Sequence, residues 1–316
     1  MMHFFRTHSR WRAPLAALAA VFLLHTNAFA IEQASTLATA SGTLAGTLTL
    51  PSKTAHAAVV LIIAGSGPTD RDGNNPLAAR NDNLKLLAEG LADAGYASVR
   101  YDKRGIGASA AAGPREADLR FDTYVEDAAG WIRMLKADPR FATVSVIGHS
   151  EGSLIGMLAA RRAGARAFVS IAGAGQGAAD ILRDQLARQL PAAMAKQANA
   201  ALAQLEQGQL TEQFPSALGA LFRPSVQPYL ISWFKYVPTT ELSKLDVPVL
   251  IVQGTSDVQV LVAQAEALKR ARPAATLTLI EGMNHLLKPA SAGEPGASLA
   301  PPLVPAIVDF LNLTSK

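Results

Sequence analysis

Short apolar runs alternate along the chain with longer segments that place apolar residues at helical spacing. Residues 57–63 form a continuous apolar run, which is typical of a strand buried on both faces of a sheet. The pattern predicts strands at residues 43–50, 57–63, 97–101, 143–147, 167–171, 247–252 and 277–280, and helices at residues 81–95, 123–135, 151–162, 261–271 and 304–311. This alternation favours an α/β fold, with a mostly parallel sheet covered by helices on both faces.

One segment, about residues 175–241, carries no strand signal. Its first part is rich in Leu and Ala at helical spacing, and four prolines interrupt the rest. We interpret it as a helical lid inserted after a strand. Aromatic side chains gather toward its C-terminal part, where they either pack the lid onto the sheet or also line a substrate pocket. The pocket candidates are Phe222, Tyr229, Trp233 and Phe234.

The first thirty residues have the pattern of a secretory signal peptide. Three arginines precede a short apolar stretch, residues 13–24, and Ala28-Phe29-Ala30 matches a small-x-small cleavage site. The apolar stretch is shorter than the roughly 20 residues of a membrane span. We therefore expect cleavage after residue 30 and a periplasmic or secreted domain at residues 31–316. A retained N-terminal anchor is the alternative.

Composition indicates a globular protein that acts on a small molecule. Hydrophobic residues make up 49% of the chain and charged residues 17%. The formal charge of +4 falls to +1 without the three signal arginines, and no Lys/Arg run remains to suggest nucleic acid. The chain has no cysteine, so it forms no disulfide and carries no lipid-bearing cysteine. After signal cleavage we expect no stable membrane span.

The candidate nucleophile is Ser150, which lies in Gly148-His149-Ser150-Glu151-Gly152 directly after a predicted strand. A serine between two glycines at a strand-to-helix turn can be held at a strained, exposed elbow, where its hydroxyl is available for attack. The motif is short enough to occur by chance, so its meaning depends on a base and an acid elsewhere in the chain.

A serine hydroxyl needs a base, nearly always an imidazole oriented by a carboxylate. Of the six histidines, three lie in the predicted signal, His56 begins an early strand, and His149 precedes the serine and should point away from it. His285 remains, in the loop after strand 277–280. Asp257 follows strand 247–252 and precedes His285, as the chain order of nucleophile, acid and base requires. The alternative for Asp257 is a cap on the next helix.

Attack on a carbonyl also needs donors for the negative charge that develops on its oxygen. The backbone N–H of Glu151 supplies one, at the start of the helix after Ser150. The small turn Ala64-Gly65-Ser66-Gly67-Pro68, after strand 57–63, should supply the second. We expect the Ser66 N–H, with Gly65 as the neighbouring alternative.

These stretches, with residues 65–73 and 101–109, resemble the α/β-hydrolase superfamily, and within it bacterial esterases grouped with serine-aminopeptidase-type hydrolases. The resemblance covers nearly all of the chain after residue 30. It implies an eight-stranded sheet, a Ser150, Asp257 and His285 triad, and oxyanion donors at Ser66 and Glu151. Ala64 departs from relatives that have a histidine at this turn, which affects loop packing more than activity.

The expected reaction is hydrolysis of carboxylic esters, with a small to medium acyl group suggested by the aromatic end of the lid. An acyl- or aminopeptidase, an acyltransferase and a non-catalytic binding module are the alternatives. A peptidase specific for free N-termini needs an acid near the site to hold the ammonium group. The lid offers four candidates: Asp180, Asp184, Glu206 and Glu212.

Two charged loops, residues 70–72 and 102–104, are expected to form ion pairs that brace the oxyanion turn rather than contact substrate. The first lacks the alternating oxygen ligands of a calcium loop. Gly105-Ile106-Gly107 has Ala110 where a dinucleotide motif needs its third glycine. The sequence therefore predicts neither a metal nor a nucleotide cofactor.

Overall fold

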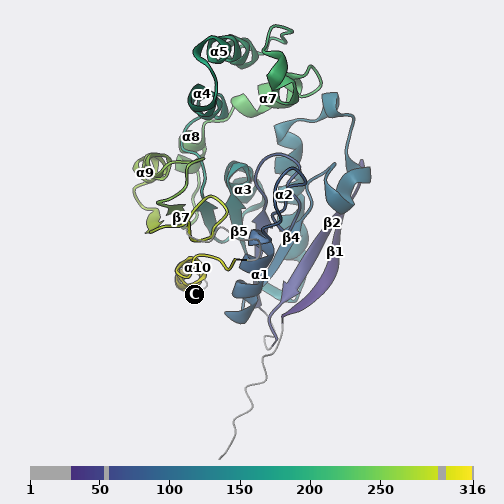
Figure 1. Ribbon diagram of the computed structural model, residues 1–316. Coiled ribbons are helices and arrows are strands. Elements are labelled where there is room, and N and C mark those ends of the chain that lie inside the picture. Colours follow the sequence, from purple (N-terminus) through teal and green to yellow (C-terminus); the bar gives the residue numbers. More distant parts are fainter. Residues whose placement is uncertain (1–29, 53–56, 291–296, 315–316) are drawn as a thin grey trace, which may run out of the picture.

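A computed structural model describes residues 30–52, 57–290 and 297–314 of the chain (Figure 1). Its strands form one eight-stranded sheet in the order β1-β2-β4-β3-β5-β6-β7-β8. β1 and β2 pair antiparallel, as do β2 and β4, and all other neighbours are parallel. The predicted α/β fold with a mostly parallel sheet is confirmed. The strands are β1 (Ile31–Thr39), β2 (Gly42–Leu50), β3 (Ala57–Ile63), β4 (Ala97–Tyr101), β5 (Phe141–His149), β6 (Phe168–Ile171), β7 (Val249–Gly254) and β8 (Thr276–Ile280).

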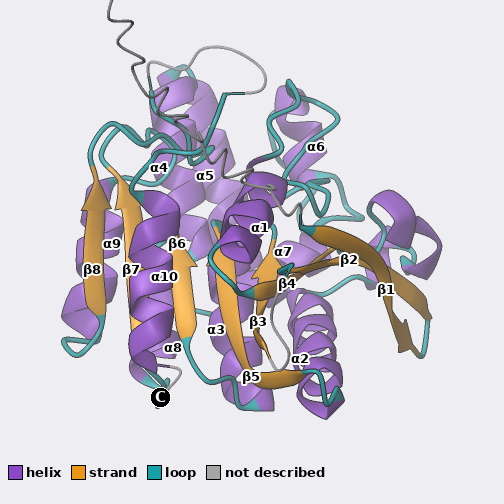
Figure 2. Ribbon diagram, turned by 90° about the horizontal axis from the view of Figure 1, so that it is seen from below, coloured by secondary structure: helices purple, strands orange, loops and turns teal. Residues whose placement is uncertain are grey.

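Helices cover both faces of the sheet, as Figure 2 shows. Helices α1 (Asn83–Asp93) and α10 (Leu303–Thr314) pack on one face. The other face carries α2 (Phe121–Ala137), α3 (Glu151–Ala163), α8 (Pro238–Ser243) and α9 (Val262–Ala271). Two hydrophobic cores result, one on each side of the sheet, and both are needed to bury a parallel sheet.

β3 shows why a continuous apolar run becomes a central strand. Alternate side chains of a strand point to opposite faces. Val60 and Ile62 accordingly lie in the core beneath α1 and α10, whereas Val59, Leu61 and Ile63 lie in the core beneath α2 and α3. Hydrophobic side chains are needed at every position because neither face reaches water.

β1 is the strand that the hydrophobic pattern did not predict. It is an edge strand with mostly exposed or half-exposed side chains, so no apolar alternation marks it. Its nine-residue pairing with β2 runs through the backbone, and Glu32 also forms an ion pair with the buried Arg100 of β4 at 2.6 Å. The predicted signal peptide lies almost wholly in residues 1–29, outside the described residues, and stays a prediction.

Between β6 and β7 the chain forms only helices, which we call the helical insertion (residues 172–248). It contains α4 (Ala178–Gln189), α5 (Ala192–Glu206), the 3-10 helix η3 (Ser216–Leu218), α6 (Gly219–Phe222), α7 (Gln227–Phe234) and α8. Helices α4, α5 and α7 gather beyond one end of the sheet, above α3 in Figure 1. All helices of the insertion except α8 share a small hydrophobic core of their own. Among the described helices, none is long and apolar enough to span a bilayer.

Candidate active site

Ser150 lies at a sharp turn between β5 and α3. Its φ of 55° and ψ of −121° are strained for a residue with a side chain, and its N–H donates to the Ile171 carbonyl at 2.9 Å. The flanking glycines are required by close packing. A Cβ at Gly148 would lie 2.2 Å from the Gly152 oxygen, and one at Gly152 would lie 2.4 Å from the Ile63 oxygen. The motif therefore folds as an elbow that presents the Ser150 side chain.

Asp257 and His285 are hydrogen-bonded, with 2.8 Å between Asp257 Oδ2 and His285 Nδ1. They come from the loops after β7 and β8, two neighbouring parallel strands, and both side chains are largely buried. His285 and Ser150 line the same cavity. No hydrogen bond joins the Ser150 hydroxyl to the His285 ring within the described part of the chain.

The Asp257 carboxylate is held by further donors. The N–H groups of Gln259 and Val260 donate to Oδ1 at 2.8 and 2.9 Å, and the Gln253 side chain donates to Oδ2 at 3.1 Å. Burial acts to raise the pKa of Asp257, but the His285 contact and the two N–H groups outweigh it, so the pKa lies below its ordinary value. Asp257 is therefore a carboxylate that can fix the His285 tautomer. Asp257 does not cap the next helix, α9, whose N-cap residue is Leu261; its Oδ1 instead accepts the N–H groups of the turn before that helix.

His149 is not among the described residues that line the cavity with Ser150, and it contacts the main chain of His285. Its Nε2 lies 2.9 Å from the His285 carbonyl oxygen, and the two rings are 4.9 Å apart. Because a carbonyl oxygen only accepts, Nε2 carries the proton. Burial, followed by the neighbouring His285, lowers the pKa of His149 to about 3. Sequence reasoning assigned no role to this neutral ring, since nothing in the sequence links it to the loop after β8.

The turn after β3 lies directly over the elbow. A Cβ at Gly65 would be 3.2 Å from the Ser150 Cβ, and Ser66 and Gly67 line the cavity beside Ser150. Glu151, at the N-terminus of α3, lines it as well. The backbone N–H groups of Ser66 and Glu151 have no acceptor among the described residues. Both N–H groups thus belong to residues that surround Ser150.

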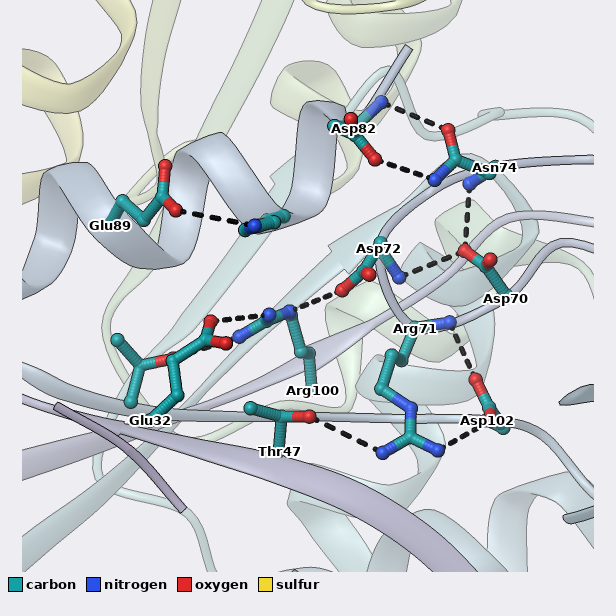
Figure 3. A network of polar contacts seen from close by, with 12 residues as sticks. Glu32, Thr47, Asp70, Arg71, Asp72, Asn74, Asp82, Glu89, Arg100 and Asp102 are labelled. Carbon is teal, nitrogen blue, oxygen red and sulfur yellow. Dashed lines mark hydrogen bonds and ion pairs between the residues drawn. The ribbon is translucent and has the colours of Figure 1, made fainter. Parts of the chain in front are cut away.

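The charged loops form ion pairs, as expected (Figure 3). Arg71 binds Asp102 through its guanidinium at 2.7 Å and through its backbone N–H at 2.8 Å. Arg100 lies between Asp72 and Glu32, at 2.7 and 2.6 Å. Asp70 has no cation partner within the described ranges. Its carboxylate instead accepts the N–H groups of residues 72 and 74, which closes the loop on itself.

The cavity has a volume of about 730 Å³, and most of its surface is apolar. Side chains of the helical insertion form much of its wall, including Tyr229 and Trp233. The prediction that Phe222 and Phe234 also line the pocket is wrong, because neither is among the described lining residues. Phe222 is fully buried in the core of the insertion against Phe214, and Phe234 packs at the edge of that core. Sequence spacing alone did not separate the ring that faces the cavity from the ring that faces the next helix.

None of the four acids proposed for binding an ammonium group lines the cavity. Asp180 and Glu206 instead pair with Arg183 on the surface of the insertion. The acids that do line it, Glu116 and Glu151, are each paired with a cation. Within the described residues, no cluster of three His, Cys, Asp or Glu could hold a metal ion.

The sequence is similar to an esterase and to a family model named for serine aminopeptidases. Residues 79–220 match the family model described as serine aminopeptidase, S33. Esterase EstD of Thermotoga maritima is 27% identical over 249 residues, which cover 77% of this chain and 58% of EstD, so the match spans less than two thirds of that relative.

Solved structures share the fold at low sequence identity. Est1E from Butyrivibrio proteoclasticus superposes with a TM-score of 0.62 at 18% identity, covering 89% of this chain and 98% of Est1E. An acylaminoacyl peptidase from Pyrococcus horikoshii gives a TM-score of 0.58 at 13% identity, covering 91% of this chain and 42% of the peptidase. The chain therefore has the α/β-hydrolase fold, and its residues 79–220 match the serine aminopeptidase family model.

Proposed function

We propose that the chain is a serine hydrolase that cleaves carboxylic esters through an acyl-enzyme on Ser150. One observation carries the proposal. The strained elbow places Ser150 in the same apolar cavity as His285, whose other ring nitrogen is bound to the Asp257 carboxylate. The relative EstD and the structural neighbour Est1E, both named as esterases, support ester chemistry.

In the proposed reaction, Ser150 Oγ forms a bond to the ester carbonyl carbon while His285 Nε2 accepts its proton. The carbonyl electrons move onto oxygen, where the N–H groups of Ser66 and Glu151 stabilise the negative charge. The intermediate collapses, the C–O bond to the alcohol breaks, and His285 protonates the leaving alcohol. Water then repeats the sequence on the acyl-enzyme and releases the acid. Asp257 holds the imidazole tautomer and stabilises the imidazolium throughout.

The cavity favours an uncharged substrate with an apolar acyl group of small to medium size. Its lining is mainly aliphatic and aromatic, and its acidic side chains already have cation partners. An aminopeptidase that reads a free N-terminus needs an unpaired acid to compensate the buried ammonium, because an isolated buried charge is costly. The described lining offers no such acid, so ester cleavage is the stronger proposal. Cleavage of a blocked or acylated peptide by the same triad is the second candidate, supported by the fold of the acylaminoacyl peptidase.

The test compares Ser150→Ala with wild type on p-nitrophenyl butyrate, and adds labelling by a fluorophosphonate probe. We expect Ser150→Ala to lose hydrolysis and labelling. Ser153→Ala is a matched control on the same helix, because the Ser153 hydroxyl is buried and hydrogen-bonded to Ser170 at 2.7 Å. It should retain both. Full hydrolysis by Ser150→Ala would end the assignment, and comparing ester with acyl-peptide turnover would decide between the two candidates.

We also propose that the protein is exported, with residues 1–30 acting as the signal peptide. The basic start, the short apolar stretch and the Ala28-Phe29-Ala30 site support this. Mass spectrometry of the protein from the periplasm or medium should show an N-terminus at Ile31. An intact chain in the membrane fraction would instead support the retained anchor.

A further inference from the structure

Lys103 is a buried cation next to the candidate nucleophile, and the reaction described above does not use it. Its side chain is 1% exposed. The Nζ donates to the Gly65 carbonyl oxygen at 2.6 Å and to Glu151 Oε2 at 3.0 Å, and it lies 5.1 Å from the centre of the Tyr124 ring. An ammonium group has three N–H donors, so a carbonyl, a carboxylate and an aromatic face satisfy it completely.

The contact with Gly65 fixes the direction of a candidate oxyanion donor. The Gly65 carbonyl and the Ser66 N–H belong to one peptide unit, which is planar and trans. The two groups therefore point in opposite directions. By holding the Gly65 oxygen, Lys103 directs the Ser66 N–H away from its own ammonium group. Ser66, Ser150 and Lys103 all line the cavity. A cation on the carbonyl also polarises the peptide and strengthens its N–H as a donor.

The second partner of Lys103 carries the other candidate donor. Glu151 follows the nucleophile, its side chain is 3% exposed, and its backbone N–H begins α3. Its remaining oxygen, Oε1, accepts the Tyr229 hydroxyl of α7 at 2.5 Å. Burial, and then the adjacent carboxylate, raise the pKa of Tyr229 well above its ordinary value, so the hydroxyl stays protonated and donates. The buried Lys103–Glu151 pair therefore contacts the peptide that carries the Ser66 N–H and includes the residue that carries the second N–H donor. Through Tyr229 it also contacts the helical insertion.

We propose that Lys103 and Glu151 are positioning residues that hold both oxyanion donors, and that Tyr229 connects this pair to the helical insertion. The inference rests on the proposed function. The pair itself touches neither the leaving group nor the attacked carbon. The pair should affect the stability of the transition state, in which negative charge develops on the carbonyl oxygen. It should affect binding of the uncharged substrate much less, because preorganised donors act mainly on the transition state.

The test uses Lys103→Met and the double variant Lys103→Met/Glu151→Gln. The double variant removes both charges while keeping similar volume, so no unpaired carboxylate stays buried if the single variant fails to fold. Losing one oxyanion donor costs about 10²–10³ in kcat, and misplacing donors that remain present should cost about 10- to 100-fold. We expect that loss in kcat on p-nitrophenyl butyrate, with KM changed less than about threefold.

Two inhibitors of equal chain length separate positioning from a general loss of packing. An alkyl trifluoromethyl ketone forms a tetrahedral adduct with a serine, whereas the matching methyl ketone only fills the pocket. We expect the variants to bind the trifluoromethyl ketone weaker by the same factor as kcat falls, with methyl ketone binding unchanged. Arg100→Met is the matched control, because it removes a buried cation of β4 whose side chain binds Glu32, Thr49 and Asp72 and neither Gly65 nor Glu151. It should lower the melting temperature and leave both inhibitor affinities unchanged.

Unchanged kcat and unchanged trifluoromethyl ketone affinity in the double variant would overturn the inference. Equal weakening of both ketones would overturn it too, since that result indicates loss of the pocket alone. The proposed function fails separately, if wild type neither hydrolyses the ester nor reacts with the fluorophosphonate probe.

Discussion

The buried His149 ring should make the stability of the protein depend on pH in a window set by one side chain. The ring is almost inaccessible to water and donates through Nε2 to the His285 carbonyl. Burial and the neighbouring His285 lower its pKa to about 3, against an ordinary value of 6.5. The folded protein therefore resists a protonation that the unfolded chain accepts freely.

The sign and size follow from this difference in pKa. Between pH 6.5 and about 3 the unfolded state binds a proton that the folded state does not, so stability falls as pH falls through this window. One proton corresponds to about 1.4 kcal/mol per pH unit. Going from pH 7 to pH 5 crosses about 1.5 units of the window, so His149 should cost on the order of 2 kcal/mol of unfolding free energy.

The measurement compares wild type with His149→Gln by urea unfolding at pH 7 and pH 5. A glutamine amide can still donate to the His285 carbonyl, but it does not titrate. Carboxylates that change between these pH values contribute equally to both proteins and cancel in the difference. Wild type should lose about 2 kcal/mol more than the variant. Equal losses in the two proteins would refute the assignment of a neutral, buried His149.

Two further predictions concern the nucleophile loop and the acid. Asp257→Asn should lower kcat on a p-nitrophenyl ester by on the order of 10⁴ with little change in KM, because the amide no longer fixes the His285 tautomer. Asp246 is exposed and lies just before β7, whereas Asp257 lies just after it, so the control variant Asp246→Asn should keep full activity. An equally large loss of kcat in Asp246→Asn would contradict the prediction. Gly152→Ala should lower the unfolding free energy by about 1–3 kcal/mol or more, since its Cβ would lie 2.4 Å from the Ile63 oxygen. The measurement is calorimetric unfolding of Gly152→Ala and of the control Gly219→Ala, whose added Cβ would meet nothing within 4 Å. Equal melting temperatures for the two variants would contradict the prediction.

The sequence predicts those elements whose burial leaves a recognisable pattern of apolar residues. β3 begins and ends at the predicted residues because both of its faces are covered, which leaves an apolar side chain at nearly every position. β1 lacks that signal, because an edge strand pairs through its backbone and exposes its side chains. The helical insertion was predicted as a segment, but its internal packing was not. Which side of a short helix Phe222 occupies depends on the neighbouring helices rather than on its own sequence.

The candidate site divides in the same way. Ser150, Asp257 and His285 could be proposed because each follows a strand, and the carboxyl ends of parallel strands meet at one edge of a sheet. The contact between His149 and the His285 carbonyl spans 136 residues and joins the end of β5 to the loop after β8, so no local sequence pattern predicts it. The charged segment at residues 102–104 was predicted to form ion pairs, but its partners had to be seen in three dimensions.

Those partners explain how a site built on loops can be held rigidly. Three consecutive residues after β4 each bind a different neighbour. Asp102 holds Arg71 beyond the oxyanion turn, Lys103 holds Gly65 and Glu151, and Arg104 holds Asp127 of α2. Each contact is a charge-assisted hydrogen bond in a largely buried setting, where such bonds are stronger than at the surface. The segment therefore ties the oxyanion turn, the nucleophile helix and the layer of helices behind it to a central strand. This geometry meets the need of a catalytic site for donors that are fixed before the substrate arrives.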